Sequence, residues 1–244
     1  MDLTMSAPPV LPAAGEVLVL GCDAEQARSL PPGFAQWLPA DDARRYSAMA
    51  AEPVRLAFAA GRALIGWLDR AAHGTSAGPD LAAGVHGKPS FRRATPWRFS
   101  LSHAAGRVLL AVTAGREIGV DVESSRRPGD YPALSRRAFH PREREWWESR
   151  GATPADFLRL WTRKEAWLKT GGEGITVELR ALDVTPWLAG VLRNGRTAAF
   201  PDSGTGHVAA VVVEGPLLAV HVADVSIQDL IVPGDFPGYS ASHE

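Results

Sequence analysis

The sequence predicts an α+β fold in which each half of the chain has several strands and one long helix. Residues 53–72 and 154–170 have apolar side chains at the spacing of amphipathic helices. Short apolar runs bounded by glycine, proline and polar residues lie around these helices, as expected of strands. A chain of 244 residues is long enough for one large domain or two small ones.

The composition excludes several classes of protein. The chain has 26 basic and 27 acidic residues, and this balance argues against a whole-protein affinity for nucleic acid or anionic membranes. Its one cysteine, Cys22, excludes an internal disulfide and a cysteine-based zinc site. No apolar run reaches about 18 residues and no secretory signal pattern is present, so we expect a cytoplasmic protein without a membrane span.

The first half begins with a predicted strand at residues 16–22, and the helix at residues 53–72 follows it. Pro53 suits the first turn of this helix. The apolar stripe of the helix consists of Val54, Ala57, Phe58, Gly61, Leu64, Ile65 and Leu68. Residues 73–96 are rich in glycine, proline, serine and threonine, which predicts a loop.

Three more strands are predicted in the middle of the chain, at residues 98–103, 107–113 and 117–123. The short link Ala114–Gly115–Arg116 predicts a hairpin between the last two of them. Arginine-rich helical segments are expected around residues 132–150.

The helix at residues 154–170 has the clearest boundaries in the chain. Thr153 and Asp156 have the spacing of a capping box, and Pro154 suits the first helical position. Gly171–Gly172 ends the helix.

Beyond this helix, short apolar runs between residues 176 and 225 predict further strands. We therefore divide the chain into an N-terminal half at residues 1–112, a C-terminal half at 113–232 and a disordered tail at 233–244.

The strand at residues 117–123 (EIGVDVE) carries the first candidate site. Side chains alternate across a strand, so Gly119, Asp121 and Glu123 point to one side. Two carboxylates about 7 Å apart can share a hard cation such as Mg²⁺, which binds one or two carboxylates, water and phosphate oxygens. The alternative is a solvated polar face on an edge strand.

The second candidate site is on the helix LWTRKEAWLK. Glu165 lies near the apolar stripe of Trp161 and Leu168, where an unpaired carboxylate is costly unless a cation accompanies it. Lys169 is four residues further on and on the same face, so the alternative is a surface ion pair. Lys164 points about 100° away and serves a different contact or none.

The third candidate site is a basic segment. Residues 81–116 contain no aspartate or glutamate but include Lys88 in an HGKP turn and the pair Ser102–His103 at a strand end. The chain has only three lysines beside 23 arginines, which is consistent with defined sites for the lysines; the alternative is chance in an arginine-biased genome. Such a segment suits a phosphorylated ligand or an acidic protein surface; the alternative is a structural histidine at a strand end.

The ordered motifs HGKP, FSLSH, IGVDVE and LWTRKEAWLK resemble those of the 4′-phosphopantetheinyl transferase superfamily, in its larger Sfp-type branch. The helix ending AAGRALIGWL is also similar to the N-terminal helix of that branch. The matching motifs extend from about Arg55 to Gly174. The resemblance implies two similar α/β halves related by a pseudo-twofold axis, with one active site in the cleft between them.

The resemblance also implies a reaction. Members move phosphopantetheine from coenzyme A to a serine of an apo carrier protein and release adenosine 3′,5′-bisphosphate, with Mg²⁺ as the metal. Asp121, Glu123 and Glu165 match the metal-binding carboxylates of the family. Glu165 is also placed to help deprotonate the serine, and Lys169 matches the lysine that stabilises pyrophosphate charge.

Other positions match the family's contacts to coenzyme A. Lys88, Ser102 and His103 match positions that hold its phosphates, and Arg62 lies where the N-terminal helix approaches the nucleotide. Ala63 departs from the hydroxyl that some members carry there, and Arg44 and Arg45 are candidates for further contacts to the 3′-phosphate. AFHPRERE resembles the F-x-x-x-E stretch of the family, which makes Glu143 a candidate either for supporting the metal ligands or for orienting a helix.

The expected partners are coenzyme A and an acidic apo acyl or peptidyl carrier protein, and the expected state is a monomer. Arg136, Arg137 and Arg142 are candidates for steering the carrier, with Trp146 or Trp147 beside them. The alternative for this segment is a solvated helical face with core tryptophans.

Two other functions remain open from the residues alone. One is a different Mg²⁺-dependent phosphoryl-transfer enzyme, which incubation with coenzyme A and an apo carrier separates from the first. The other is a non-catalytic module that binds a carrier or coenzyme A; the complete set Asp121, Glu165 and Lys169 argues against it.

Overall fold

The computed structural model describes residues 9–84, 86–172, 179–185 and 195–232. The strands are β1 (Glu16–Asp23), β2 (Leu81–Ala83), β3 (Pro89–Phe91), β4 (Trp97–Ala104), β5 (Arg107–Ala114), β6 (Ile118–Ser124), β7 (Arg196–Ala199), β8 (His207–Glu214) and β9 (Ala219–Asp224). The α-helices are α1 (Phe34–Trp37), α2 (Ala40–Ala48), α3 (Glu52–His73), α4 (Tyr131–Ala138), α5 (Pro141–Ser149), α6 (Pro154–Gly171) and α7 (Ile227–Leu230). Two short 3₁₀ helices, η1 (Ala24–Ser29) and η3 (Leu179–Ala181), complete the described elements.

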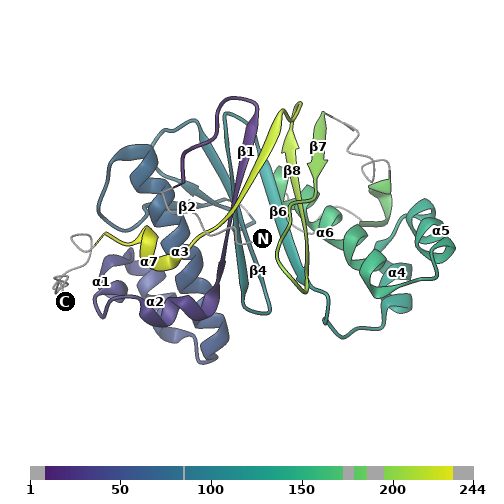
Figure 1. The fold of residues 1–244 in the computed structure, drawn as a ribbon, viewed down its shortest axis with the longest axis horizontal. Coiled ribbons are helices and arrows are strands. Elements are labelled where there is room, and N and C mark those ends of the chain that lie inside the picture. The colour runs from purple at the N-terminus through teal and green to yellow at the C-terminus, as the bar shows by residue number, and fades with distance from the viewer. Residues whose placement is uncertain (1–8, 85, 173–178, 186–194, 233–244) are drawn as a thin grey trace.

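Four layers make up the body of the molecule: α3, a four-stranded sheet, a three-stranded sheet and α6 (Figure 1). The four-stranded sheet has the order β4-β5-β1-β9. Its strand β1 is antiparallel to β5 and parallel to β9. Leu18 and Leu20 of β1 pack on the α3 side, while Val17 and Val19 pack on the opposite side.

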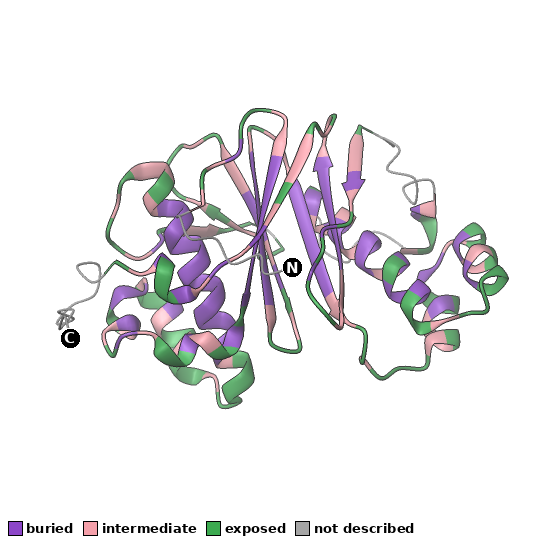
Figure 2. Cartoon of the chain, in the orientation of Figure 1, coloured by how far each residue is buried: buried purple, intermediate pink, exposed green. Residues whose placement is uncertain are grey.

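The three-stranded sheet has the order β6-β8-β7, and its inner face packs against the first sheet. Val120 and Val211 of this sheet belong to the same apolar cluster as Val17 and Val19, so the centre of the molecule is buried between two sheets (Figure 2). Helix α6 covers the outer face. Gly119 permits that approach, because a Cβ there would lie 2.0 Å from the carbonyl oxygen of Ala166.

Serine side chains join the two sheets where β4 runs beside β6. The hydroxyl of Ser100 accepts a hydrogen bond from the Val120 amide at 3.1 Å, and that of Ser102 accepts one from the Val122 amide at 3.4 Å. These hydrogen bonds join a side chain of one strand to the backbone of the other. They are not the backbone-to-backbone bonds of a sheet, so β4 and β6 belong to separate sheets.

The hairpin predicted across Ala114–Gly115–Arg116 is therefore wrong. Strand β5 already has β4 on one edge and β1 on the other, so β6 has no free edge to pair with and starts a second sheet. The hairpin partner of β5 is β4, joined to it through Ala105 and Gly106.

The predicted mixed α+β fold is confirmed, and so are the two long helices. Thr153 caps α6 by accepting a hydrogen bond from the Asp156 amide at 3.1 Å, and Gly172 ends the helix with a φ of 63°. The sequence patterns predict no element for the polar segment that forms α2. The strands β2 and β3 lie within residues 73–96, which are predicted to be a loop. No helix among the described residues is long and apolar enough to cross a membrane.

The division of the chain into halves at residues 112 and 113 stays a prediction. Residues 107–114 form one continuous strand, and β9 returns to the sheet of the N-terminal half. The pseudo-twofold relation also stays a prediction, and the tail at 233–244 lies outside the described residues.

Candidate active site

Three side chains from three elements meet at the junction of the two sheets. Lys169 of α6 lies with its Nζ 2.7 Å from Asp121 Oδ1 on β6 and 2.9 Å from Ser102 Oγ on β4. Ser102 donates its own hydroxyl proton to Asp121 Oδ1 at 2.9 Å. The folding pattern thus brings together a carboxylate, an ammonium and a hydroxyl from residues far apart in the sequence.

The other oxygen of Asp121 is the unusual atom of this cluster. Asp121 is only 6% exposed, and its Oδ2 is buried without a hydrogen-bond partner among the described residues. A buried anionic oxygen without a partner is costly, and a hard cation is the kind of ligand that offsets this cost. The donor chemistry of the cluster therefore fits Mg²⁺.

Glu165 and Glu123 complete the set of carboxylates. Glu165 is half-buried, and its pKa is raised first by burial and then by the negative charge of Asp121. Burial also raises the pKa of Glu123, while Arg127 opposes the change. Glu123 accepts hydrogen bonds from Arg127 and, at 3.1 Å, from Trp161 Nε1.

A metal role for these carboxylates stays a prediction. The described parts of the chain contain no group of three or more histidine, cysteine, aspartate or glutamate side chains placed to hold an ion. The charge of Asp121 contributes to the raised pKa of both Glu123 and Glu165, so the three carboxylates lie near one another.

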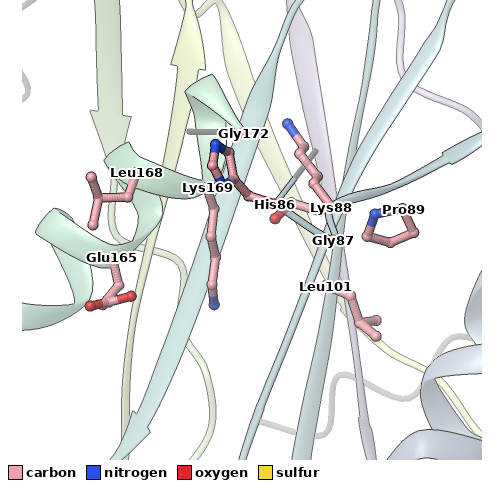
Figure 3. Close-up of a pocket in the computed structure, with 10 residues that line it drawn as sticks. His86, Gly87, Lys88, Pro89, Leu101, Glu165, Leu168, Lys169 and Gly172 are labelled. Carbon is pink, nitrogen blue, oxygen red and sulfur yellow. The ribbon is translucent and has the colours of Figure 1, made fainter. Parts of the chain in front are cut away.

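Lys169 does not form the surface ion pair with Glu165 that helical spacing allows. The two side chains extend on the same side of α6 (Figure 3), but the ammonium of Lys169 bonds to Asp121 and Ser102 instead. Only 32% of the Lys169 side chain is exposed. Its charge is therefore directed to the junction between the sheets and not to bulk solvent.

A cavity of about 250 Å³ adjoins this cluster. Glu165, Leu168 and Lys169 line it from α6, Ser100 and Leu101 line it from β4, and the HGKP turn at 86–89 lines it from the other side (Figure 3). The four-stranded sheet, α6 and the HGKP turn thus form its walls, with the catalytic candidates Glu165 and Lys169 facing inward.

A larger cavity of about 1060 Å³ continues from the first, sharing Gly87, Pro89 and Leu101 with it. Its basic lining residues are Arg44, Arg45, Arg62, Arg92 and His103, and its acidic ones are Asp41, Asp42 and Asp80. His103 has a lowered pKa because the surrounding chain removes water from its ring and because Lys169 is positive.

Two predicted coenzyme A contacts have partners of their own. The Nζ of Lys88 points away from Lys169 (Figure 3) and lies 2.8 Å from Glu117, with the carbonyl oxygens of Ile118 and Thr170 as further acceptors. Lys88 thereby links the HGKP turn to the start of β6 and the end of α6.

Arg62 is buried and binds both carboxylate oxygens of Asp42, at 2.6 and 3.0 Å. Its guanidinium also stacks on the ring of Phe58. The segment 81–116 contains no acidic residue, but the acids just outside its ends pair with its arginines. Asp80 pairs with Arg92, and Glu117 pairs with Arg98. Coenzyme A contacts by Arg62, Lys88, Ser102 and His103 stay predictions.

One buried ion pair was not anticipated from the sequence. Lys164 Nζ lies 2.8 Å from Glu143 Oε2, and both side chains are fully buried. The amine also donates to the carbonyl oxygens of Leu179 and Leu182, and Glu143 accepts from the amides of His140 and Val184. Glu143 therefore links α5 to α6 through Lys164. The scarcity of lysine was the one sequence feature that could have indicated this ion pair. Each of the three lysines has a carboxylate partner in the structure.

The candidate carrier-steering residues divide into two groups. Arg136, Arg137 and Arg142 are exposed. Trp147 is a core residue at 2% exposure, whereas Trp146 is half-buried and stacks against Arg150. Of the two tryptophans, only Trp146 is placed to meet a partner.

Comparison with known proteins adds independent findings. Residues 117–212 match the family model of the 4′-phosphopantetheinyl transferase superfamily. The chain is 37% identical over 124 residues to the 4′-phosphopantetheinyl transferase HetI of Nostoc sp.. It is 31% identical over 163 residues to the transferase AcpT of Escherichia coli, and 31% identical over 110 residues to a 4′-phosphopantetheinyl transferase of Bacillus subtilis.

These matches cover different shares of the chains. They span 48%, 65% and 44% of this chain, and 52%, 73% and 48% of the Nostoc, Escherichia and Bacillus relatives respectively. The chain thus matches about half the length of two of these relatives and nearly three quarters of the third. The family model begins one residue before β6 and ends within β8, so it includes Asp121, Glu165 and Lys169.

Proposed function

Because the chain belongs to the 4′-phosphopantetheinyl transferase superfamily, we propose that it transfers phosphopantetheine from coenzyme A to a serine of an apo carrier protein. The observation that carries the proposal is the meeting of Asp121, Ser102 and Lys169 next to a cavity that Lys169 and Glu165 line. This set contains an anion to hold a cation, an ammonium for phosphate oxygens and a carboxylate to receive a proton.

The reaction exchanges one phosphorus–oxygen bond for another. The serine oxygen of the carrier attacks the β-phosphorus of coenzyme A, and the bond from that phosphorus to the bridging oxygen breaks. Adenosine 3′,5′-bisphosphate leaves with the electron pair. Glu165 lines the cavity with no hydrogen bond of its own among the described residues, so its carboxylate is available to take the serine proton, directly or through water.

Lys169 supplies positive charge where negative charge develops. Its ammonium lies on the inner side of α6 between Asp121 and the cavity, and a side chain with four rotatable carbons can reach a pyrophosphate oxygen from there. Ser102 holds this ammonium and the carboxylate of Asp121 at the same time, so it positions both.

Asp121, Glu123 and Glu165 are the residues that would hold Mg²⁺. When bound, that ion neutralises charge on the pyrophosphate and on the attacked phosphate. The buried oxygen of Asp121 without a partner supports this assignment.

The larger cavity supports a site for the nucleotide end of coenzyme A. His103, Arg45 and Arg92 line it, and its volume of about 1060 Å³ suits a nucleotide with three phosphates. The exposed residues Arg136, Arg137 and Arg142 support an encounter surface for an acidic carrier.

A mass-spectrometric assay tests the proposal. A panel of apo acyl and peptidyl carrier proteins is incubated with the enzyme, coenzyme A and Mg²⁺, and each carrier is examined for the phosphopantetheine mass gain. Modification of at least one carrier, lost when Mg²⁺ is chelated, is the expected result. Hydrolysis of coenzyme A without carrier modification would indicate a different phosphoryl-transfer reaction, and binding without any reaction would indicate a non-catalytic module.

A further inference from the structure

A second basic cavity lies on the side of α6 that faces away from the candidate active site. Its volume is about 550 Å³, and α5, α6, β8 and the residues after β7 form its walls. Arg163 lies two residues before Glu165, which places it about 200° around the helix from that carboxylate. This cavity shares no lining residue with the cavity of about 250 Å³ at the candidate active site.

Arg163 is the central residue of this second cavity. It is only 4% exposed, and its Nε and Nη1 are buried without hydrogen-bond partners among the described residues. Its guanidinium stacks on the ring of Phe200, 4.0 Å from the ring centre. Burial and the neighbouring charge of Arg159 lower its pKa to about 10.

Among the described residues, no carboxylate forms an ion pair with Arg163. Asp156 and Glu143 act on Arg163 through their charges, but Asp156 is already bound by Arg150 at 3.3 Å and by Arg159 at 3.4 Å, and Glu143 is bound by Lys164. Asp202 also lines the cavity, and its Oδ1 accepts the amide hydrogen of Gly204. A buried guanidinium without a paired anion is costly, so a structural role alone does not explain it.

His207 gives an independent observation at the same place. Its Nε2 is likewise buried without a hydrogen-bond partner among the described residues, and its ring lines the cavity from the start of β8. Two nitrogen-bearing side chains with unsatisfied atoms, together with Arg150 and Arg159, therefore surround one hollow. All of these groups are hydrogen-bond donors, so a ligand with several acceptor oxygens would satisfy them.

We propose that this cavity binds a phosphate group, with Arg163 providing the charge and His207 a hydrogen bond. A phosphate offers more acceptor oxygens than a carboxylate, and arginine is well suited to it. The half-buried ring of Trp146 and the exposed ring of Phe200 leave apolar surface beside the phosphate for an organic substituent. The site is separate from the coenzyme A cleft and does not depend on the proposed transferase reaction.

The test follows two histidine rings by NMR while the full chain is titrated with inorganic phosphate. His207 reports on the second cavity and His103 on the coenzyme A cleft, and replacing each with glutamine assigns its signal. The pH is constant, and the ionic strength is held at about 0.1 M with chloride. A parallel titration with acetate separates phosphate binding from binding of any oxyanion.

The variant Arg163→Gln removes the proposed charge, and Arg196→Gln is the matched control. Arg196 is also largely buried and stacked on a tryptophan, but it has Glu214 and the carbonyl oxygen of Trp167 as partners. Circular dichroism melting checks that each variant is folded. Arg163→Lys restores the charge if the glutamine variant does not fold.

We expect phosphate to shift the His207 signal with saturation, and Arg163→Gln to weaken this response at least about tenfold. Arg196→Gln leaves the response unchanged, and the His103 response is the same in both variants. An unmoved His207 signal would overturn the proposal, as would an equal shift in Arg163→Gln. An equal response to acetate would replace the phosphate assignment with general anion binding.

Discussion

Lys169 Nζ lies 2.7 Å from Asp121 Oδ1, although 48 positions separate the two residues in the sequence. The contact connects the last turns of α6 to the middle of β6, and Ser102 of β4 closes it into a three-membered cluster. This relationship explains how a carboxylate with little exposure remains compatible with folding before any ligand binds, because an ammonium and a hydroxyl stabilise one of its oxygens.

Removing the carboxylates should affect turnover far more than stability. We expect Asp121→Ala and Glu165→Ala each to reduce Mg²⁺-dependent turnover by at least roughly 100-fold, while the free energy of unfolding changes by no more than about 1.5 kcal/mol. The double variant should be little worse than either single one, because each disables the same site. Near wild-type rates at saturating Mg²⁺ in either single variant would refute the assignment.

Two serines on one strand provide a matched comparison. Both Ser100 and Ser102 accept a hydrogen bond from a β6 amide, but only Ser102 also contacts Asp121 and Lys169. Ser100→Ala and Ser102→Ala should therefore destabilise the protein by similar amounts, about 1 kcal/mol each. Only Ser102→Ala should lower kcat markedly, which steady-state kinetics will measure. Equal kinetic effects would mean that Ser102 serves the junction of the sheets and not the site.

The two lysines of α6 should have opposite phenotypes. Lys164→Met leaves Glu143 buried without its counter-charge, so we expect a loss of about 3–5 kcal/mol in unfolding free energy. Lys169→Met should cost less stability than Lys164→Met, because 32% of the Lys169 side chain is exposed and Asp121 remains hydrogen-bonded to Ser102, but it should abolish most turnover. Denaturant titration and kinetics on both variants check the contrast. Adding Glu143→Gln to Lys164→Met should recover part of the lost stability; no recovery would show that packing, not charge, explains the loss.

Cys22 should report on global unfolding. It is 1% exposed, and burial raises the pKa of its thiol to about 12. The thiolate is the reactive form, so native protein at neutral pH should react with a thiol reagent only through unfolding. The rate of labelling should match the rate predicted from denaturant unfolding data. Fast labelling of native protein would show local opening of β1.

Coenzyme A binding should take up a proton at His103. Its lowered pKa, caused by dehydration and by Lys169, keeps the free ring neutral near pH 7, and a bound phosphate favours the charged ring. Calorimetry in buffers of different ionisation enthalpy should detect the uptake, and His103→Gln should remove it. Proton release, or equal uptake in the variant, would exclude His103 from phosphate binding.

The same pKa shift affects stability. Because the folded state holds the His103 proton less tightly than the unfolded state, stability should fall as the pH drops below about 6.5, the ordinary pKa of histidine. Thermal melting of wild type and His103→Gln across this range measures the contribution, which the variant should lack.

The long helices and most strands could be predicted because their patterns are local. Capping residues and periodic apolar side chains set the bounds of α3 and α6 within one or two residues. The sheet arrangement could not be predicted in the same way. Whether β6 pairs with β5 depends on whether β1 already occupies the second edge of β5, and that contact spans about ninety residues of sequence.

The candidate site shows a similar division. Alternation along β6 and helical spacing along α6 correctly grouped Asp121 with Glu123 and Glu165 with Lys169 on shared faces. Periodicity within one element cannot show which residue of another element it meets. The pairing of Lys169 with Asp121, and of Lys164 with Glu143, depends on how α6 lies across β6 and α5.

The position of β9 has a consequence for synthesis on the ribosome. This strand comes from residues 219–224 but fills the edge of β1, whose residues 16–23 are translated much earlier. Until those residues emerge, β1 has an open edge, and the sheet formed by β4, β5 and β1 is exposed to pairing with other chains. We therefore expect the N-terminal sheet to complete its fold only after translation has passed β9, with chaperones protecting the waiting edge.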